Sequence, residues 1–378
     1  MKITLITIMW FLWFLNFSSR SVFSPLLPVI EDELSISHTL AGSLFLFISI
    51  GFTISVFLSG LVSRYIGYKR TIIFCFLASI SSMLLLRYAD TYNQLAGFCF
   101  FIALTAGFYF PCAVPFITSI FDLGNWGKAI TFHETAPPSS YIAVPVLVAL
   151  GLGFFYWKTI FLILGGVSLV FIILFWLTAP DPRPLAGKPG LYSQVLLRKD
   201  FWLITLIWTI SNMATNGIYN IVPLFLVKER GIPFELANTI FGFSRAGGLL
   251  ATIILGFILD RYALKRILFT IVIVTGLSTI GLAVIRVFWI LIGMLFIQAT
   301  MCIIFFPASI FAISKLTTIE ERGTFMGITM GIASIFGFGI CPMALGMVAD
   351  KWNFQSGILV LGILVTLSCI VLRGLKEL

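Results

Sequence analysis

Apolar positions in this chain run unbroken for about twenty residues at a time and are separated by short polar connections. Such runs lack the period-two alternation of a barrel strand, and a helix crossing the bilayer core needs about 20 apolar residues. The pattern predicts an all-α membrane protein with twelve transmembrane helices. The expected spans are 4–29, 38–63, 71–88, 94–121, 128–153, 157–179, 201–226, 235–259, 266–285, 287–314, 323–348 and 355–372.

The longest polar stretch, residues 180–200, is rich in proline and reads as a linker. We therefore expect a first six-helix bundle at 1–179, a cytoplasmic linker at 180–200 and a second six-helix bundle at 201–378. An offset of 196 positions aligns the two halves, which indicates an internal duplication and two pseudo-twofold-related bundles. The aligned landmarks are Leu40 with Leu236, Ala41 with Ala237, Gly60 with Gly256, Lys69 with Lys265, Arg70 with Arg266, Pro111 with Pro307 and Gly127 with Gly323.

Composition supports the membrane assignment, because 60% of the residues are apolar, 10% are charged and the mean hydropathy is +1.09. The net charge of +9 comes from cations scattered at the ends of apolar runs, so we expect no nucleic-acid partner. Alternate connections, starting from the N-terminus, carry most of these cations, and the positive-inside rule then places both termini in the cytoplasm. The first fifteen residues read as part of a helix that continues to about Val29, and not as a signal peptide.

Enzymatic constellations are absent from the sequence. The six cysteines sit singly in apolar runs, the sequence after His133-Glu134 lacks the second histidine of a zinc motif, and no phosphate-binding loop occurs. We expect neither a metal nor another cofactor.

Two loops carry a motif. Residues 60–70 read GLVSRYIGYKR and residues 256–266 read GFILDRYALKR, and both resemble the G-x-x-x-D-R-x-G-R-[RK] loop of the major facilitator superfamily. Trp157 to Phe161 and Gly346 to Asp350 resemble the family elements that precede the sixth and twelfth helices. The resemblance implies a secondary transporter with a substrate cavity near mid-membrane and alternating access.

The same resemblance assigns gating roles to the loop residues, because a glycine lets helices approach closely and a compact charged turn can pair in one conformation only. The expected gating residues are Gly60, Arg64, Gly67, Lys69, Arg70, Gly256, Asp260, Arg261, Lys265 and Arg266. The first loop departs from the family, with Arg64 in place of the aspartate and Tyr65 in place of the arginine. An alternative reading is that its cations only enforce orientation.

Polar residues inside the apolar runs are the candidate site, because a charge at mid-bilayer is costly and normally faces a cavity or a partner. Asn16, Arg20 and Ser24 recur every four residues on the first span, and the offset turns them into Asn212, Asn216 and Asn220. The expected substrate-binding residues are Asn16, Arg20, Ser24, Tyr109, Asn212, Asn216, Tyr219, Asn220 and Arg245.

Two arginines among carboxamides favour an anion, since guanidinium holds carboxylate or phosphate in a bidentate fork. A small organic anion is therefore the expected solute. Three alternatives stay open: Arg20 snorkels toward the headgroups, Arg245 ties its helix to a neighbour, and the asparagines join helices.

His133 and Glu134 are the proton-coupling candidates, because burial of Glu134 would favour its neutral form. The alternative is that both bond to a neighbouring helix or to backbone freed by Pro137 and Pro138. The expected function is proton-coupled symport by a monomer in a bacterial inner membrane. An exporter of drug-like compounds is less favoured, because the fourth span lacks an arginine and the fifth lacks the antiporter Gly-Pro pattern. A channel or receptor-like protein does not explain the duplication.

Overall fold

The computed structural model describes residues 2–182, 192–259 and 261–375, and these residues form helices without any strand. Ten helical stretches among these residues, several of which join two or more of the helices named below, are long and apolar enough to cross a membrane. The all-α membrane fold class is thereby confirmed. Helices suit these apolar runs because lipid offers no hydrogen bonds, so each segment has to satisfy its own backbone groups.

The chain divides into two compact units. Unit 1 comprises Met1–Ile36 and Phe47–Gly187, and unit 2 comprises Ser37–Leu46 and Lys188–Leu378. The division near residue 187 lies inside the stretch read as a linker, of which residues 183–191 lie outside the described residues. The expected first bundle, 1–179, differs from unit 1 in one internal segment, because the first turns of the second span, within Ser37–Leu46, belong to unit 2.

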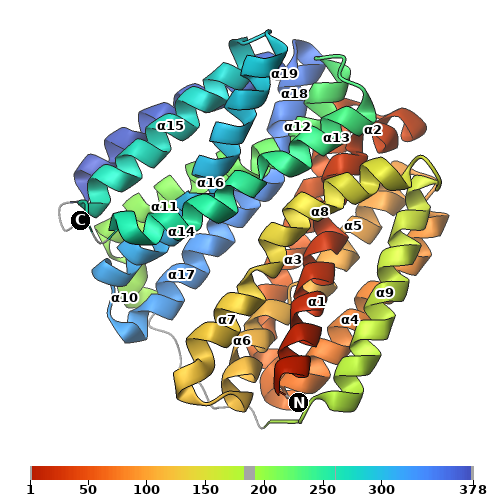
Figure 1. Ribbon diagram of the computed structural model, residues 1–378, viewed down its shortest axis with the longest axis vertical. Coiled ribbons are helices and arrows are strands. Elements are labelled where there is room, and N and C mark those ends of the chain that lie inside the picture. The colour runs from red at the N-terminus through yellow and green to blue at the C-terminus, as the bar shows by residue number, and fades with distance from the viewer. Residues whose placement is uncertain (1, 183–191, 260, 376–378) are drawn as a thin grey trace. The chain divides into compact units, whose positions relative to one another are not determined.

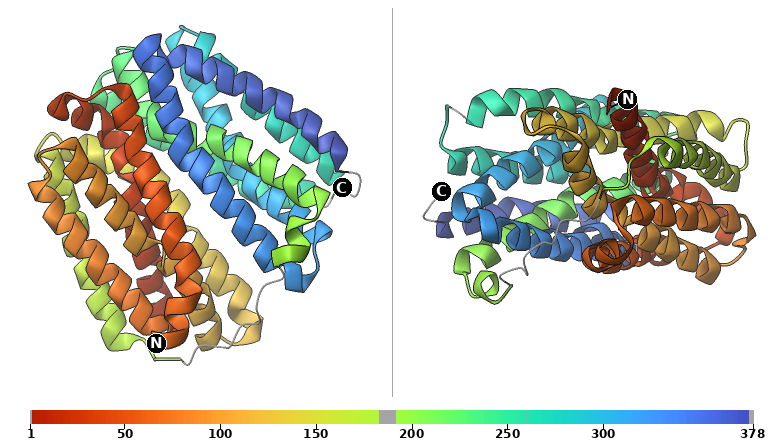
Figure 2. Two further views of the ribbon diagram at one scale, coloured as in Figure 1. Left: turned by 180° about the vertical axis from the view of Figure 1, so that it is seen from behind. Right: turned by 90° about the horizontal axis from the view of Figure 1, so that it is seen from below.

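Unit 1 carries the helices of the first half of the chain (Figures 1 and 2). In order they are α1 Lys2–Ser21, α2 Phe23–Leu34, α3 His38–Ile66, α4 Tyr68–Leu85, η1 Leu86–Tyr88, α5 Tyr92–Ala106, α6 Tyr109–Ile120, η2 Leu123–Asn125, α7 Trp126–Glu134, α8 Ala136–Gly151 and α9 Trp157–Thr178. Helix α1 packs against α8 and α9, and α4 packs against α5 and α9. Trp176 and Leu177 of α9 are exposed, as expected for a lipid-facing helix.

Unit 2 repeats this order after the linker (Figure 1). Its elements are α10 Tyr192–Leu196, α11 Lys199–Asn212, η3 Met213–Gly217, α12 Ile218–Lys228, α13 Phe234–Ser244, α14 Ala246–Leu259, α15 Leu264–Val284, α16 Phe288–Leu316, α17 Ile319–Ala333, η4 Ser334–Ile340, α18 Cys341–Lys351, α19 Phe354–Ser368 and η5 Cys369–Gly374. Helix α15 lies along both α16 and α19, while η3 packs against η4.

Several of the predicted spans are interrupted helices. The span expected at 128–153 breaks at Thr135, just before two prolines that lack a backbone N–H. The span at 201–226 contains the π-helical turn η3. The fourth span breaks between Ala106 and Tyr109, which places Pro111 in the first turn of α6, whereas α16 runs unbroken through Pro307. The two aligned prolines therefore stand in different local structures.

The 196-residue offset relates contacts in the two units. In unit 1 Lys69 Nζ donates to the Ala179 carbonyl at 2.5 Å, and in unit 2 Lys265 Nζ donates to the Leu375 carbonyl at 2.8 Å. Each lysine thereby ties the start of its third span to the carbonyl that ends the sixth. This pairing satisfies a carbonyl that helix geometry leaves without a partner.

A second pair of related contacts lies at the opposite helix ends. Glu33 accepts from Trp157 Nε1 at 2.7 Å and from the Tyr156 hydroxyl, which joins α2 to the start of α9. Glu229 accepts from the backbone N–H of Phe354 and Gln355 and thus caps α19. The two carboxylates sit at equivalent sequence positions, although one bonds side chains and the other bonds backbone.

A carboxylate from α18 caps helix α3. Asp350 Oδ1 accepts from the His38 N–H and Asp350 Oδ2 accepts from the Thr39 N–H, both at 2.9 Å, and the Thr39 hydroxyl also donates to Oδ2. These N–H groups lie in the first turn of α3, where no helical acceptor exists. The cap explains why Ser37–Leu46 associates with unit 2.

We predict that Asp350→Ala lowers the free energy of unfolding by about 1–2 kcal/mol, because the first turn of α3 loses its acceptor. Asp350→Asn should retain most of the stability, since an amide oxygen accepts the same bonds. The measurement is denaturant unfolding of the purified protein in detergent. Equal stability of the alanine variant and the wild type would refute the cap.

Candidate functional site

The arginine of unit 1 lies on α1 among aromatic rings. Arg20 is only 7% exposed, and its guanidinium carbon lies 4.2 Å from the ring centroid of Phe52 and 5.3 Å from that of Phe17. Desolvated cation–π contacts of this kind contribute about 2 kcal/mol. The burial favours an inward placement over snorkelling toward a headgroup.

The predicted face of α1 forms as expected. Arg20 Nη2 lies 3.4 Å from Asn16 Oδ1, one helical turn away. Asn16 Nδ2 in turn donates to the Ala106 carbonyl at 3.1 Å, where α5 is interrupted. Ser24 is buried one turn further along, on α2. The Asn16 amide therefore contacts the arginine and also donates to a backbone carbonyl that the break in the fourth span leaves without a helical partner.

The arginine of unit 2 ends helix α13. Arg245 is 2% exposed, and its guanidinium carbon lies 4.8 Å from the Tyr219 ring centroid and 5.7 Å from that of Phe241. In both units the cation lies between the first and second spans of that unit. Unit 1 supplies it from the first span and unit 2 from the second, so the offset alone does not relate the two arginines.

Unit 2 also contains two π-helical turns that pack together. Asn216 Nδ2 donates to Asn212 Oδ1 at 3.1 Å, which reproduces the contact of Arg20 with Asn16 at the offset positions. A Cβ on Gly217 would lie 2.5 Å from Cys341 Sγ, and one on Gly337 would lie 2.2 Å from Asn212 Oδ1. Only glycine permits this approach of η3 and η4. Such π-turns occur frequently at functional sites.

The third asparagine joins helices. Asn220 Nδ2 donates to the Phe338 carbonyl at 3.2 Å. Phe338 lies four residues before Pro342, which has no N–H to offer in the usual helical pattern. Gln298 of α16 makes a related contact, donating through Nε2 to the Ala214 carbonyl at 2.8 Å. These bonds favour the interhelical role at Asn220, while Asn212 and Asn216 remain on the predicted face.

A hydrogen-bonded chain surrounds His133. Its Nε2 lies 3.0 Å from Tyr109 Oη, and its Nδ1 lies 2.8 Å from Glu134 Oε1. The Tyr109 hydroxyl donates to the Met9 carbonyl at 2.9 Å. The indole of Trp13 stacks parallel to the imidazole, with centroids 5.9 Å apart. Tyr109 thus belongs with His133, and no contact joins it to Arg20 among the described residues.

The tautomer of His133 decides which of its ring nitrogens donates. With the Tyr109 hydroxyl donating to Met9, the phenol oxygen accepts from His133 Nε2–H. With the hydroxyl donating to Nε2 instead, His133 Nδ1–H donates to the Glu134 carboxylate.

Burial differs within the pair. His133 is fully buried, whereas the Glu134 side chain is 39% exposed because α7 ends at this residue. The expectation that burial keeps Glu134 neutral is therefore wrong. The acid instead provides an exposed end to a chain that is otherwise buried, which is the arrangement that a proton path requires.

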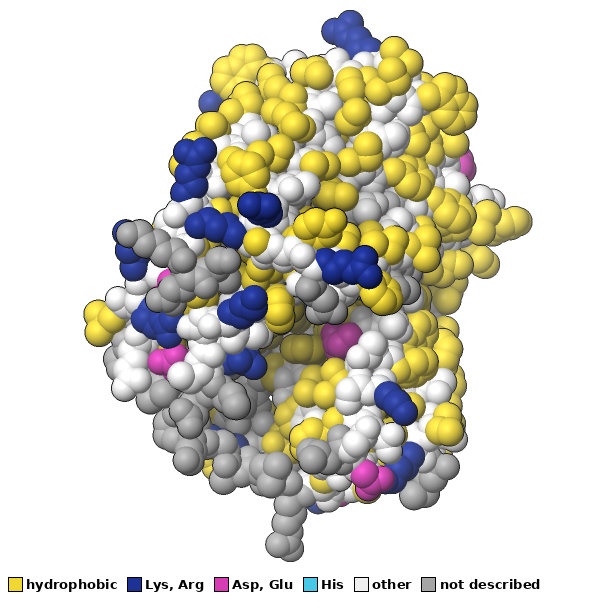
Figure 3. Space-filling view, turned by 60° about the vertical axis from the view of Figure 1, so that its left-hand side comes forward, with side chains coloured by type: hydrophobic (Ala, Val, Ile, Leu, Met, Phe, Trp, Pro, Cys, Tyr) yellow, Lys and Arg dark blue, Asp and Glu magenta, His cyan; other side chains and the backbone are white. Residues whose placement is uncertain are grey.

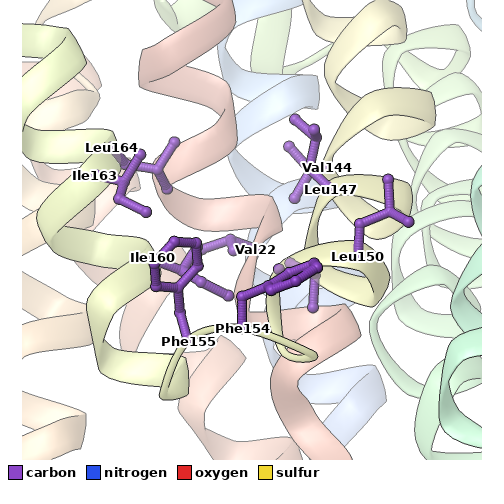
Figure 4. A pocket seen from close by; sticks show the side chains of 11 residues that line it. Val22, Val144, Leu147, Leu150, Phe154, Phe155, Ile160, Ile163 and Leu164 are labelled. Atoms are coloured by element: carbon purple, nitrogen blue, oxygen red, sulfur yellow. The ribbon is translucent and has the colours of Figure 1, made fainter.

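The most enclosed surface cavity of unit 1 differs in character. Figure 4 shows side chains of α8 and α9, among them Leu147, Ile160 and Ile163, converging on a space of about 330 Å³. Every labelled lining residue is apolar, so this cavity suits lipid and gives a charged solute nothing to bind.

Comparison with known proteins agrees with this architecture. The model of the Major Facilitator Superfamily matches residues 9–303 and 236–377. The chain belongs to the major facilitator superfamily. Members of this superfamily are transporters, so the chain is a membrane transporter and not an enzyme.

Curated relatives are distant. The chain is 27% identical over 230 residues to an MFS-type efflux pump of Mycolicibacterium smegmatis, covering 57% of this chain and 53% of the relative. It is 26% identical to sugar efflux transporter A of Dickeya chrysanthemi, covering 58% and 56%. These matches therefore span about half of each relative. Sugar efflux transporter B of Salmonella typhimurium is 24% identical, with 81% and 79% covered.

Solved structures share the fold. A bacterial homologue of the human lysosomal transporter Spinster aligns with a TM-score of 0.82 at 14% identity, covering 99% of this chain and 96% of that one. The nucleoside transporter NupG aligns with a TM-score of 0.80 at 16% identity, covering 99% of both. The D-xylose-proton symporter aligns with a TM-score of 0.78 at 14% identity, covering 97% of both.

The loop residues of this superfamily member have distinct environments. Gly67 has φ +87, which requires glycine, whereas Ala263 at the offset position has φ −60 and needs none. Arg70 lies 3.6 Å from Asp181, and both side chains are largely exposed. A Cβ on Gly60 or Gly256 would meet open space, so the expected close helix approach at these glycines is wrong. Arg64, Arg261 and Arg266 are exposed, and Asp260 lies outside the described residues.

Several residues of the transporter were missed by sequence reasoning. Phe52, Phe241 and Trp13 place rings on the two arginines and on His133, but nothing distinguishes them among 39 phenylalanines and 9 tryptophans. Gln298 could have been found, because it is an isolated amide inside the apolar run at 287–314.

We predict that Asn220→Ala lowers the free energy of unfolding by about 1–3 kcal/mol, because the Phe338 carbonyl is left without this donor. Pro342→Ala restores a backbone N–H, so Asn220→Ala should cost less in that background. A double-mutant cycle of detergent-solubilised protein measures the difference. Identical costs in both backgrounds would show that the asparagine does not serve this carbonyl.

Proposed function

We propose that this transporter moves a small organic anion and couples its movement to protons. The observation that supports the solute class is the burial of Arg20 and Arg245, each with aromatic rings over the guanidinium. A guanidinium holds carboxylate or phosphate in a bidentate fork, so buried arginines suit an anionic solute. Amide groups of Asn16, Asn212 and Asn216 add donors that suit carboxylate or hydroxyl oxygens.

The first test identifies the ligand class. Purified protein is heated with gluconate, glucuronate, citrate, inorganic phosphate, glucose or tetraphenylphosphonium, because only a ligand of the folded state raises the unfolding temperature. We expect stabilisation by a carboxylate or phosphate. Stabilisation by glucose or tetraphenylphosphonium alone would reject an anionic solute.

We predict that Arg20→Gln or Arg245→Gln reduces uptake of the identified anion into proteoliposomes at least about tenfold, because a charge-assisted contact contributes on the order of 1.5–3 kcal/mol. Arg20→Lys should retain part of the uptake, since it keeps the charge but loses the planar fork. Arg87→Gln, which removes an exposed cation, is the matched control. Uptake at the wild-type rate by correctly folded Arg20→Gln protein would remove Arg20 from the site.

The proposed coupling site is the His133 chain. It joins a buried imidazole to a partly exposed acid, and Trp13 stacks on the imidazole from the same helix that carries Arg20. Trp13 and Arg20 lie seven residues apart, or about 10 Å along α1. A change in protonation at His133 therefore acts on the helix that carries the arginine.

We predict that Glu134→Gln abolishes accumulation driven by an imposed pH gradient but retains exchange of solute. The amide N–H donates permanently to His133 Nδ1 and so imitates the protonated acid. Proteoliposomes with an acidic outside, compared with counterflow at equal pH, measure the two activities. Asp122→Asn is the control, since its exposed pair with Lys2 contributes little. A wild type indifferent to the gradient would mean that the protein is a facilitator.

Sugar efflux is a second candidate function, because two of the similar proteins are named sugar efflux transporters. The amides of Asn16, Asn212 and Asn216 suit hydroxyl groups as well as carboxylates. Stabilisation by glucose in the thermal screen, followed by proton-driven export from inverted vesicles, would favour this function over anion symport.

The proposed location is a bacterial inner membrane, with both termini in the cytoplasm. The cations at the ends of the predicted spans support this orientation through the positive-inside rule.

A further inference from the structure

Three cations surround a surface pocket of unit 2. Lys265, Arg266 and Arg373 line it together with Phe269 and Leu372, around a space of about 530 Å³. The pocket lies where α15 begins and η5 ends, so residues far apart in sequence supply its two walls. It is separate from the arginine and histidine clusters described above.

Among the described residues, no carboxylate balances the charges at this pocket. Lys265 Nζ donates to the Leu375 carbonyl, which holds the lysine in place without neutralising it. Arg266 and Arg373 are exposed, and in the described ranges no carboxylate forms an ion pair with either.

The backbone adds to the positive potential. Helix α15 starts at Leu264, and the side chain of its preceding residue, Ala263, provides no capping acceptor. The first turn of a 21-residue helix therefore presents N–H groups and the positive end of its dipole beside the cations. An anion with several acceptor oxygens satisfies both kinds of donor.

The pocket joins the ends of two candidate spans, Leu264–Val284 and Phe354–Gly374. Phe269 and Leu372 supply apolar lining beside the cations. In the space-filling view of Figure 3, lysine and arginine side chains gather beside broad apolar surface. This combination of charge and apolar wall matches a lipid, whose phosphate and acyl chain are joined.

The other unit supplies an internal contrast. By the 196-residue offset, Lys69 and Arg70 correspond to Lys265 and Arg266, but Leu177 stands in the place of Arg373. Asp181 pairs with Arg70 at 3.6 Å. The position in unit 1 therefore lacks the third cation, while its Asp181 corresponds by the offset to Glu377, which lies outside the described residues.

We propose that the pocket binds the phosphate diester of an anionic phospholipid, with Arg266 and Arg373 holding the phosphate and an acyl chain lying along Phe269 and Leu372. Basic pockets between transmembrane helices on the cytoplasmic side recognise such headgroups. The bound lipid fixes the start of α15 relative to the end of the last helix.

The test counts bound lipids by native mass spectrometry of the protein in dodecyl maltoside. Dioleoylphosphatidylglycerol, dioleoylphosphatidylcholine and inorganic phosphate are added in separate titrations. Arg266→Gln/Arg373→Gln is compared with Arg87→Gln/Arg286→Gln, which removes two exposed cations from other connections. Lys265 is left unchanged because its bond to Leu375 supports the fold. Arg373→Leu, which introduces the residue found at the offset position of unit 1, is a second variant that tests the pocket even if the double variant misfolds.

We expect wild type and the control to retain phosphatidylglycerol in preference to phosphatidylcholine. The Arg266→Gln/Arg373→Gln protein should bind phosphatidylglycerol about 25-fold more weakly, since each of the two cations near an anionic headgroup contributes on the order of fivefold in affinity. Arg373→Leu should lose about fivefold. Equal retention by the double variant and the control would overturn the proposal. Displacement of phosphatidylglycerol by millimolar phosphate would also overturn it, by assigning the pocket to a free anion.

Discussion

Backbone groups inside a membrane need partners from the protein, and this constraint governs most of the polar contacts here. Wherever a helix is interrupted or ends, a side chain takes over the missing bond. Asn16 donates to the Ala106 carbonyl at the break in the fourth span, and Asn220 donates to the Phe338 carbonyl ahead of a proline. Gln298 donates to the carbonyl of Ala214 in the π-turn η3. The polar residues that look most like a binding site are therefore partly engaged in supporting broken helices.

The same constraint links structure to transport. In a regular helix almost every backbone group is hydrogen-bonded within the helix. A helix broken at a π-turn or proline instead has backbone groups that can change hydrogen-bond partners at low cost. Both π-turns lie in unit 2, and the helix break beside His133 lies in unit 1. Tyr219, whose ring lies 4.8 Å from the Arg245 guanidinium carbon, follows η3 by two residues. Asn16, which contacts Arg20, bonds the carbonyl at the break in the fourth span.

The surroundings of His133 show how neighbouring elements shape the environment of one side chain. His133 and Glu134 are adjacent in sequence, but the imidazole also contacts Tyr109 of α6, whose hydroxyl bonds the Met9 carbonyl of α1. Three helices therefore meet at one imidazole.

The sequence alone indicated the class of solvent, the all-α membrane fold and the family, because twenty-residue apolar runs and a repeated loop motif are local or periodic signals. It also identified Arg20, Arg245 and His133, because a polar residue within an apolar run is visible without coordinates. Only the tertiary structure decided that Phe52 and Tyr219 cover the arginines, that Glu134 is exposed and that Tyr109 serves His133. Asp350 capping α3 was equally hidden, because its partners lie more than three hundred positions away. Such contacts depend on which helix faces meet, and the apolar pattern of a membrane helix is nearly uniform around its axis.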